Sequence, residues 1–388
     1  MNKDFSHLKK EQLISLRDRY YAGEIVKDLE NKYELSFPLS SRISQLPPIE
    51  YQQYSCPYCG IAMISPCQTR RHIDRMEHSM YCSSCKHHPN RYVECNCDNC
   101  RRVKSDQLDA KKEEMRRYFS ISRPSIDFHS LSLENKIYLG ALCAAQLSED
   151  LGYIRSLKST KATLTPTDEM NRHLYRSLLE SGVISVSPDS PISAFDLEHP
   201  NFPNVFDEDK VQYSLNLQWP ENPSTLISEI LQPTYYHPES MHEDAQKLFT
   251  NLAISECIAY LLFQMHQVRF AFSPGEKTYK TFELILRDFS VYQVYGIIWK
   301  AVAESSKLYL EHRYTKPHAA NTVITSCGRY ADRARINQWS LSQYRRPREL
   351  PISSLSQFFY YKVLKIGDKA YSYPPTLRIS NTSNLNDK

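Results

Sequence analysis

Apolar residues recur at helical spacing through the last part of the chain. The strongest segments are 248–270 and 289–312, and the second carries one apolar stripe running from Val291 to Val302. Residues three and four positions apart lie on one face of an α-helix, so such stripes are typical of helices that pack into a core. The pattern therefore predicts a helical domain over 221–388.

The first 48 residues carry two shorter helical stripes, separated by a turn at Gly23. Leu16 and Tyr20 share a face of the first stripe, and Leu29 and Tyr33 share a face of the second. The segment resembles the homeodomain-like helix-turn-helix of recombinases and transposases at Gly23, Val26, Leu29, Tyr33, Leu35 and Ser36. This resemblance implies DNA recognition, but the would-be recognition helix, 37–42, has one basic side chain. A helical hairpin used for packing or dimerisation is the alternative over 1–48.

A charged segment, 104–127, predicts a connecting helix. Glu113 and Glu114 are placed against Arg117 at the spacing of helical ion pairs. We expect this helix to be solvated and to link folded units.

Residues 128–220 combine two helical stripes with a short strand. The first helix is expected to begin near Ser132. The second is expected to start at Thr165 and to stop at Gly182, just before the strand 183–186. This order resembles a winged helix-turn-helix. The resemblance implies DNA contact, for which Arg172 and Arg176 are the outward candidates, or docking of a protein partner.

Eight of the eleven cysteines lie between 56 and 100. They read Cys56-x2-Cys59, Cys67, Cys82-x2-Cys85 and Cys95-x-Cys97-x2-Cys100. Two thiolates at i and i+3 on a tight turn can share one tetrahedral ion, and a second such turn completes the coordination. In a reducing compartment this clustering favours metal over disulfides. The sequence therefore predicts a zinc-ribbon region over 49–103 that holds one Zn²⁺.

The sequence leaves open whether the chain binds a second Zn²⁺. Three further thiolates follow the two pairs, namely Cys95, Cys97 and Cys100. The fourth ligand would come from His87, His88 or Cys67. In the alternative, the three thiols are spare or compete for the ion of a single ribbon.

Other chemistries also use closely spaced cysteines. A thioredoxin-like Cys-x2-Cys follows a buried strand and opens a helix in a βαβ unit, whereas Cys56 follows the Pro-rich, polar segment 46–55. The region also resembles HNH nucleases at 56–60, His72, Asn90 and 97–104. That resemblance implies metal-dependent cleavage with His72 as the base. The chain departs from the HNH pattern, because no acid precedes His72.

Arg313 and His318 have the Arg-x4-His spacing that resembles the active-site pair of HEPN ribonucleases. The resemblance implies RNA cleavage by a pair of residues on a helix. Pro317 lies inside the motif and opposes a continuous helix, and such a short spacing also arises by chance.

Basic residues concentrate in two regions of a chain whose net charge is only +4. Residues 56–104 hold eight Lys/Arg against four Asp/Glu, and residues 313–348 hold eight against one. Aromatic residues interleave with the bases of the second region, as in surfaces that bind phosphate and stack on bases. The candidate nucleic-acid contacts are Arg70, Arg71, Arg91, Arg101, Arg102, Lys104, Arg172, Arg176, Arg329, Arg333, Arg345 and Arg346.

Composition removes several classes of function. Only nine glycines are present, and the chain has no GxGxxG, GxxxxGK[ST] or HExxH motif, which disfavours nucleotide-driven motors, dinucleotide enzymes and zincin proteases. No apolar run approaches the ~18 residues of a membrane span, and we expect no secretion signal at the N-terminus. We expect a cytoplasmic protein that does not associate with a membrane.

Together these patterns predict a mainly α, multidomain protein. Its parts are a helix-turn-helix-like N-terminus, a zinc-ribbon region, a linker helix, a winged-helix-like unit and a C-terminal helical domain. The expected function is zinc-stabilised binding of nucleic acid, most simply DNA, in a bacterial regulatory, mobile-element or defence setting, without turnover. The alternatives are a metal-dependent or HEPN-like nuclease and a non-catalytic subunit that meets protein partners or a second copy.

Overall fold

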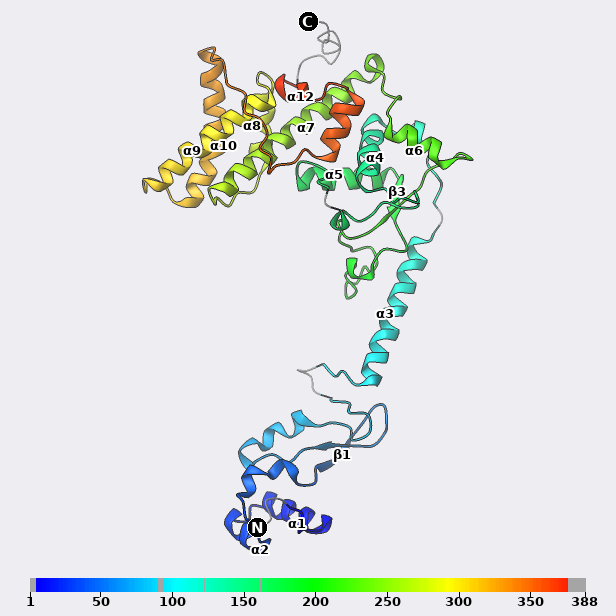
Figure 1. Ribbon diagram of the computed structural model, residues 1–388, viewed down its shortest axis with the longest axis vertical. Helices are drawn as coiled ribbons and strands as arrows, with labels where there is room; N and C mark the ends of the chain where they lie inside the picture. The colour runs from blue at the N-terminus through cyan, green and yellow to red at the C-terminus, as the bar shows by residue number, and fades with distance from the viewer. Residues whose placement is uncertain (1–4, 90–93, 122, 161, 376–388) are drawn as a thin grey trace. The chain divides into compact units, whose positions relative to one another are not determined.

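The computed structural model describes residues 5–89, 94–121, 123–160 and 162–375. The chain divides into two compact units, Met1–Glu113 and Glu114–Lys388, with the boundary inside helix α3, Asp98–Phe119 (Figure 1). Helices dominate the described residues, and two small two-stranded sheets accompany them. The mainly α class expected from the sequence is therefore confirmed.

The first unit begins with two short helices, α1 (Lys10–Tyr21) and α2 (Val26–Lys32). Gly23 ends α1 with a φ of +96°, a backbone conformation that glycine adopts without steric cost. Two 3-10 turns follow, η1 (Leu39–Ser41) and η2 (Ile43–Gln45). They lie where the resemblance to a helix-turn-helix implies a recognition helix. Proline restricts the residue before it to extended conformations, so the Phe37-Pro38 pair opposes a helix there.

A two-stranded antiparallel hairpin follows these turns. Strands β1 (Ile49–Ser55) and β2 (Ala62–Ser65) pair antiparallel, with Ile49 opposite Ser65 and Ser55 opposite Ala62. An isolated antiparallel bridge between Ile64 and Tyr81 adds a third segment to the hairpin. The 3-10 turns η3 (Arg70–Arg75) and η4 (Glu77–Ser79) lie along the chain between β2 and Tyr81. The hairpin thus brings residues near 56 beside residues near 82.

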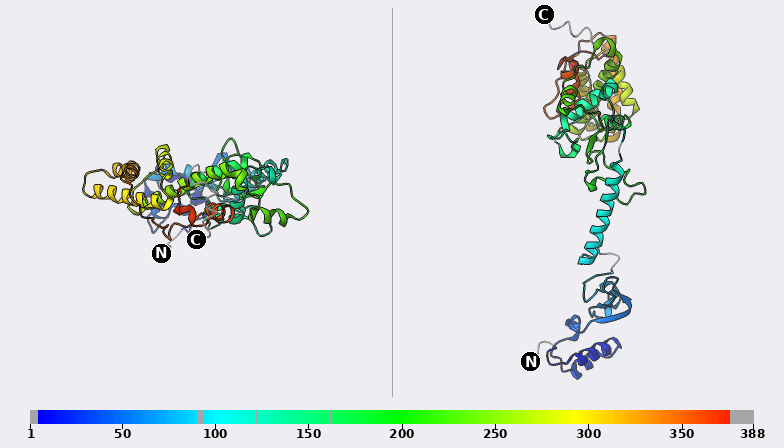
Figure 2. Two further views of the ribbon diagram at one scale, coloured as in Figure 1. Left: turned by 90° about the horizontal axis from the view of Figure 1, so that it is seen from above. Right: turned by 90° about the vertical axis from the view of Figure 1, so that its right-hand side faces the viewer.

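The second unit contains the remaining regular elements (Figure 2). Its helices are α4 (Leu133–Gln146), α5 (Asp168–Glu180), α6 (Pro223–Leu231), α7 (Pro238–Gln267), α8 (Glu276–Leu286), α9 (Val291–Leu310), α10 (Lys316–Ile336), α11 (Ser354–Gln357) and α12 (Lys369–Ser372). Shorter turns are η5 (Phe128–Ser130), η6 (Leu157–Ser159), η7 (Ile192–Ala194) and the π-helical turn η8 (Phe358–Val363). Its sheet pairs β3 (Ile184–Val186) with β4 (Tyr213–Leu215).

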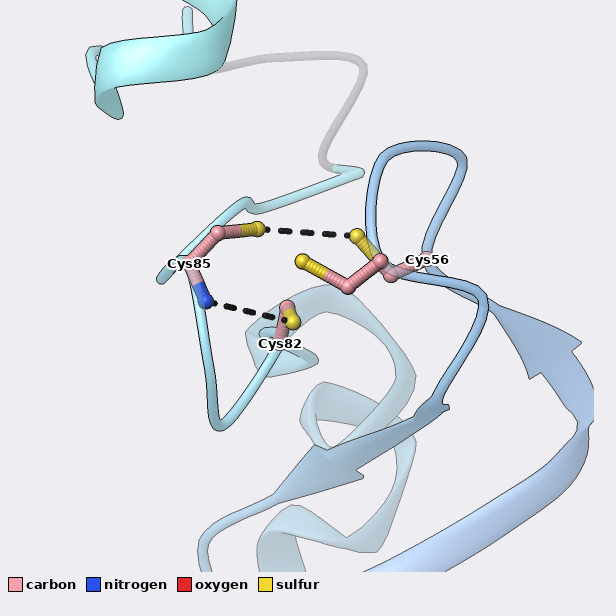
Figure 3. A group of neighbouring side chains, drawn as sticks. Cys56, Cys82 and Cys85 are labelled. Carbon is pink, nitrogen blue, oxygen red and sulfur yellow. Dashed lines mark hydrogen bonds between the residues drawn. The ribbon is translucent and has the colours of Figure 1, made fainter.

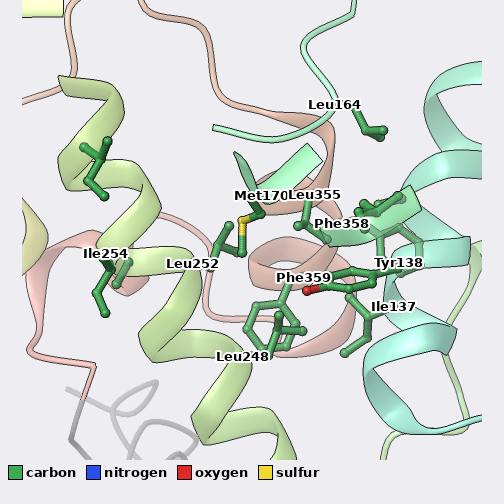
Figure 4. Packing of buried hydrophobic residues seen from close by; sticks show 14 of the residues in the cluster. Ile137, Tyr138, Leu164, Met170, Leu248, Leu252, Ile254, Leu355, Phe358 and Phe359 are labelled. Carbon is green, nitrogen blue, oxygen red and sulfur yellow. The ribbon is translucent and has the colours of Figure 1, made fainter. Parts of the chain in front are cut away.

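One hydrophobic core runs through the second unit, from Met115 to Tyr371. Figure 4 shows part of this core, where Ile137, Leu252 and Phe359 lie close together. Phe358 of η8 packs so closely on Gly140 of α4 that a Cβ at position 140 would lie 2.3 Å from its ring. The segments expected as separate domains, 128–220 and 221–388, therefore share their core.

Two details of 128–220 differ from the sequence expectation. Helix α5 begins after Thr167, whose side chain accepts a hydrogen bond from the Met170 N–H, and not after Thr165. The Thr165 hydroxyl instead donates to the Thr167 carbonyl. Strands β3 and β4 are separated by residues 187–212 rather than by the tight turn of a simple wing.

Helix α7 is the longest helix of the second unit among the described residues. It is long and apolar enough to cross a membrane by length and composition alone, whereas the sequence predicted no such helix. Its most apolar stretch is 72% buried inside the molecule, where its residues belong to the core of the second unit.

Candidate metal centres

Two turns of identical backbone design present the first four cysteines. In the first, the Gly60 N–H donates to the Cys56 carbonyl at 2.9 Å, and the Cys56 N–H donates to the Ile61 carbonyl at 2.8 Å. In the second, the Lys86 N–H donates to the Cys82 carbonyl at 2.9 Å, and the Cys82 N–H donates to the His87 carbonyl at 2.8 Å. We call these turns, 56–61 and 82–87, the two knuckles. Each turns both of its thiols toward one point.

The two knuckles face each other and form the first cluster, Cys56, Cys59, Cys82 and Cys85. The four sulfurs lie within 4.8 Å of one another. The Sγ atoms of Cys56 and Cys85 are 3.6 Å apart, and the Cys85 N–H points at the Cys82 Sγ from 3.4 Å (Figure 3). A tetrahedral ion with metal–sulfur bonds of about 2.3 Å separates its ligands by about 3.8 Å. The cluster therefore has the size of a four-thiolate metal site.

The acidity of these thiols shows why such a cluster needs a cation. Burial raises the pKa of Cys85, but the His87 N–H and the neighbouring thiols outweigh it, and the pKa falls to about 7. The hydrogen bond to Cys85, together with burial, raises the pKa of Cys59 to about 12. Adjacent thiolates repel one another, so losing one proton makes the next harder to lose. A divalent ion at the centre removes this penalty.

A second cluster consists of His87, Cys95, Cys97 and Cys100, whose ligand atoms also lie within 4.8 Å of one another. The His87 Nδ1 and the Cys100 Sγ are 3.2 Å apart, and the His88 N–H donates to the Cys95 Sγ at 3.2 Å. Helix α3 places Cys100 in its first turn, where the Arg101 N–H donates to the Cys97 carbonyl at 2.9 Å.

His87 joins the two clusters, because it offers its ring to the second while its backbone belongs to a knuckle of the first. Burial lowers the pKa of the His87 ring, which favours the neutral imidazole that can bind a metal. Tyr58, from the other knuckle, lies edge-on to this ring with centroids 5.0 Å apart, and its hydroxyl is 3.4 Å from the Cys100 Sγ. The two clusters are thus built on one continuous framework.

All seven cysteines predicted as metal ligands lie in these clusters, each of which could hold a metal ion such as zinc. Of the three candidates for the remaining ligand, the structure places His87 in the second cluster. Cys67 is fully buried in the core of α1 and α2, where its thiol donates to the Pro47 carbonyl. The ring of His88 lies 3.3 Å from the Met80 carbonyl. Sequence spacing left this choice open, because all three are close enough along the chain.

The basic candidates in the first unit differ in their surroundings. The Arg70 guanidinium donates to the Tyr20 and Glu24 carbonyls and stacks over the Tyr20 ring, so it ties the ribbon to α1. Arg71 and Arg102 are exposed.

The next bases along the chain have acidic neighbours. Arg101, 68% exposed at its side chain, contacts Asp98, and Lys104 contacts Glu94 at 2.6 Å. Such exposed pairs are worth little in water and exchange readily for phosphate. Arg91 lies outside the described residues.

The basic candidates of the second unit also fall into groups. Arg346 forms an ion pair with the fully buried Glu256 and is 9% exposed. Arg329, Arg333, Arg345 and Arg176 are exposed on the surface.

Arg172 lines a cavity of about 470 Å³. The acids that share this cavity with it are Asp168, Asp207, Glu208 and Asp209. The lining is therefore unfavourable for phosphate, since carboxylates repel it.

None of the three catalytic candidates belongs to a metal cluster found in the described residues. His72 is exposed in η3, and its Nδ1 lies 2.9 Å from the Thr69 hydroxyl. Arg313 lies in the turn between α9 and α10, where it pairs with Glu311 at 3.3 Å. His318 is in the first turn of α10, against Tyr314. Pro317 sits at the start of α10, so the Arg-x4-His pair spans a turn and a helix start rather than one helix.

Comparison of the chain with family models, with curated proteins and with solved structures found no match.

Proposed function

We propose that the chain is a zinc-stabilised nucleic-acid-binding protein, with DNA as the first ligand to test. The observation that carries the proposal is the continuity between the second cluster and a basic helix start. Cys100 offers its thiol to that cluster, and Arg101, Arg102 and Lys104 follow it on the exposed first turns of α3. Metal binding would therefore fix the helix that carries these cations.

Zinc fits both clusters by ligand chemistry. Four thiolates, or three thiolates and one imidazole, are the donor sets of structural zinc sites in proteins. Soft sulfur donors disfavour magnesium and calcium, which prefer oxygen. The residues that would hold the two ions are Cys56, Cys59, Cys82 and Cys85 for the first, and His87, Cys95, Cys97 and Cys100 for the second.

Complete coordination also argues for binding rather than hydrolysis. A catalytic zinc keeps a position for water, whereas each cluster here offers four protein ligands. The HNH-like alternative requires His72 beside a metal, and neither cluster found in the described residues includes it. The chain's own contribution would then be to position cations, and phosphate groups would displace the exposed carboxylates of Asp98 and Glu94.

A binding titration with a charge-matched control tests the proposal. Labelled duplex and single strands are titrated at several salt concentrations with the full chain, with the double variant Arg101→Ala/Arg102→Ala and with Lys27→Ala/Lys32→Ala. Both variants remove two exposed charges from the first unit, the latter from α2. We expect affinity to fall steeply with salt and the arginine variant to bind at least about tenfold more weakly than the lysine variant. Equal binding by the two variants, or affinity indifferent to salt, refutes the proposal.

A further inference from the structure

A row of aromatic side chains with one lysine lies on helices α9 and α10 and on the segment after α10. Trp299, Trp339 and Lys300 are exposed, whereas Tyr330 and Tyr344 are half-buried. The Trp299 and Tyr344 rings have centroids 5.8 Å apart, and the Tyr330 and Trp339 rings have centroids 5.7 Å apart. Lys300, the residue after Trp299, contacts the second pair, because its Nζ is 2.6 Å from the Tyr330 hydroxyl and 4.9 Å from the centroid of that ring. We call these five residues the stacking surface.

The backbone after α10 fixes the position of Trp339. Gln338 takes a φ of +51° and donates its N–H to the Arg335 carbonyl at 3.2 Å, and the Trp339 N–H donates to the Ala334 carbonyl at 2.9 Å. These two bonds form a Schellman motif, which ends a helix in one defined direction. The backbone of Trp339 is therefore held in one defined position, and 45% of the residue is exposed.

A close packing contact fixes the other end of the surface. Segment 337–344 returns across α9, where a Cβ on Gly296 would lie 2.9 Å from the Tyr344 ring and 3.2 Å from the Ser342 carbonyl. The Tyr344 N–H also donates to the Tyr292 carbonyl at 2.9 Å. This contact holds Tyr344 against Trp299, which is itself 45% exposed.

Cations surround these rings. Lys300 is exposed, and Arg329 and Arg333 flank Tyr330 along α10. Arg345, also exposed, follows Tyr344. Asp332, the acid of this stretch, is paired with Arg335 at 2.8 Å. The surface thus combines two exposed tryptophans with a positive field that an anionic polymer complements.

We propose that the stacking surface binds unpaired nucleic acid, with bases against Trp299 and Trp339 and phosphates against the surrounding cations. This inference rests on the proposed function and names the form of nucleic acid that the second unit takes. Rings that lie open to solvent can stack on any base whose face is free, whereas the faces of paired bases are covered by their neighbours in a duplex. Two tryptophans ordered by backbone contacts lose little entropy on binding.

Tryptophan fluorescence tests this inference directly, because the chain has three tryptophans and two lie in the surface. The third, Trp219, is 39% exposed in the segment before α6 and is the matched control. A twenty-nucleotide oligothymidine is titrated into the full chain, Trp339→Ala, Trp299→Ala and Trp219→Ala, followed by emission and by anisotropy of the labelled strand. Trp339→Phe keeps a ring at the same place, and thermal melts of all variants report folding.

We expect the single strand to quench emission, and Trp339→Ala and Trp299→Ala to weaken its binding by about 5- to 100-fold each. Trp219→Ala and Trp339→Phe should bind within about twofold of the unaltered chain, and duplex affinity should change little. Unchanged single-strand affinity in both alanine variants overturns the inference. The proposed function still stands in that case if Arg101→Ala/Arg102→Ala weakens binding. If the unaltered chain binds neither single strands nor duplex, both this inference and the proposed function are overturned. Self-association abolished by Trp339→Ala would instead assign the surface to a second copy of the chain.

Discussion

Gly60 and Lys86 occupy equivalent places in the two knuckles. Their φ angles are +69° and +60°, and each donates its N–H to the carbonyl of the cysteine four residues earlier. This left-handed conformation lets the chain reverse after the second thiol of each pair, so that both sulfurs face the same ion. Glycine adopts it freely, whereas a side chain at Cβ makes it costly.

This relationship predicts opposite effects of two substitutions. Gly60→Ala should weaken metal binding, because the added Cβ costs about 1 kcal/mol at that φ, equivalent to about a fivefold loss of zinc affinity. Space is not the reason, since no atom lies within 4 Å of the position a Cβ would take. Lys86→Gly should hold zinc as tightly or more tightly. Competition with a chromogenic chelator measures both affinities, and a loss in Lys86→Gly equal to that in Gly60→Ala would contradict the backbone argument.

Single substitutions of the eight cysteines in the first unit should change the zinc content of the chain to different extents. Cys100→Ser should lower the content from two ions per chain to about one, because it removes a ligand of the second cluster. Cys67→Ser should leave two ions, because that thiol is buried between α1 and α2. Mass spectrometry under native conditions, or metal analysis after gel filtration, gives the count. Loss of an ion from Cys67→Ser would show that Cys67 belongs to a metal site.

Chelation should unfold only part of the molecule. The core around the first cluster is small, with Met63 and Met80 as its buried non-cysteine members, so without metal it has little to hold it together. The second unit has a large continuous core, and both candidate clusters in the described residues lie outside it. Thermal unfolding followed by circular dichroism should therefore lose one transition after EDTA and keep the other. A shift of both transitions would show that the core of the second unit depends on metal.

Cysteine spacing was sufficient to predict the ligands because it carries the geometry of the site. A Cys-x2-Cys pair can present two thiols only from a tight turn, and two pairs about twenty residues apart fit a hairpin. The choice of His87 over Cys67 could not be made in the same way. It depends on the Cys67 thiol packing against α1 and α2, which is a tertiary contact.

Surface bases were harder to interpret from sequence, because burial separates residues that are neighbours along the chain. Arg345 and Arg346 look alike in the sequence, yet one is exposed and the other pairs with Glu256 inside the second unit. The sequence also could not show that the segments 128–220 and 221–388 share one core. Helices near 137 and near 252 pack on one another only in the folded core.

Arg346→Ala should destabilise the second unit strongly. It leaves Glu256, whose side chain is fully buried, without its cation, although Ser356 and Tyr371 still donate hydrogen bonds to that carboxylate. Removing one partner of a buried pair costs about 3–5 kcal/mol. Urea unfolding followed by circular dichroism should show this loss in the transition of the second unit.

The adjacent Arg345→Ala is the matched control. Arg345 is exposed, so its replacement should change stability by less than about 0.5 kcal/mol. If Arg345 contributes to the stacking surface, the same variant should bind single strands more weakly. Equal stability of Arg346→Ala and the unaltered chain would mean that the buried ion pair is not formed.

Asp207 and Asp209 face the same cavity and should respond to pH in opposite ways. Asp207 accepts hydrogen bonds from Lys210 at 2.9 Å and Lys158 at 3.0 Å, and these cations lower its pKa from 3.8 to about 2 despite the opposing effect of burial. Burial and the nearby Asp207 raise the pKa of Asp209. A carboxyl whose pKa is lower in the folded state stabilises that state when ionised, and one whose pKa is higher destabilises it.

The sign and the pH window follow from these directions. The contribution of Asp207 is complete above about pH 4 and is lost as pH falls toward 2, so Asp207→Asn should be less stable at pH 7 and equal to the unaltered chain at pH 2. The Asp207 side chain is 34% exposed, and solvent screening limits the loss to about 1 kcal/mol or less.

Asp209→Asn should be at least as stable as the unaltered chain at pH 7, because it removes an ionised group that burial disfavours. Urea unfolding of both variants between pH 2 and pH 7 measures the difference between them. If Asp207→Asn and Asp209→Asn lost stability together as pH rises, the two lysines would not distinguish these carboxylates, and the arrangement of charges around the cavity would be wrong.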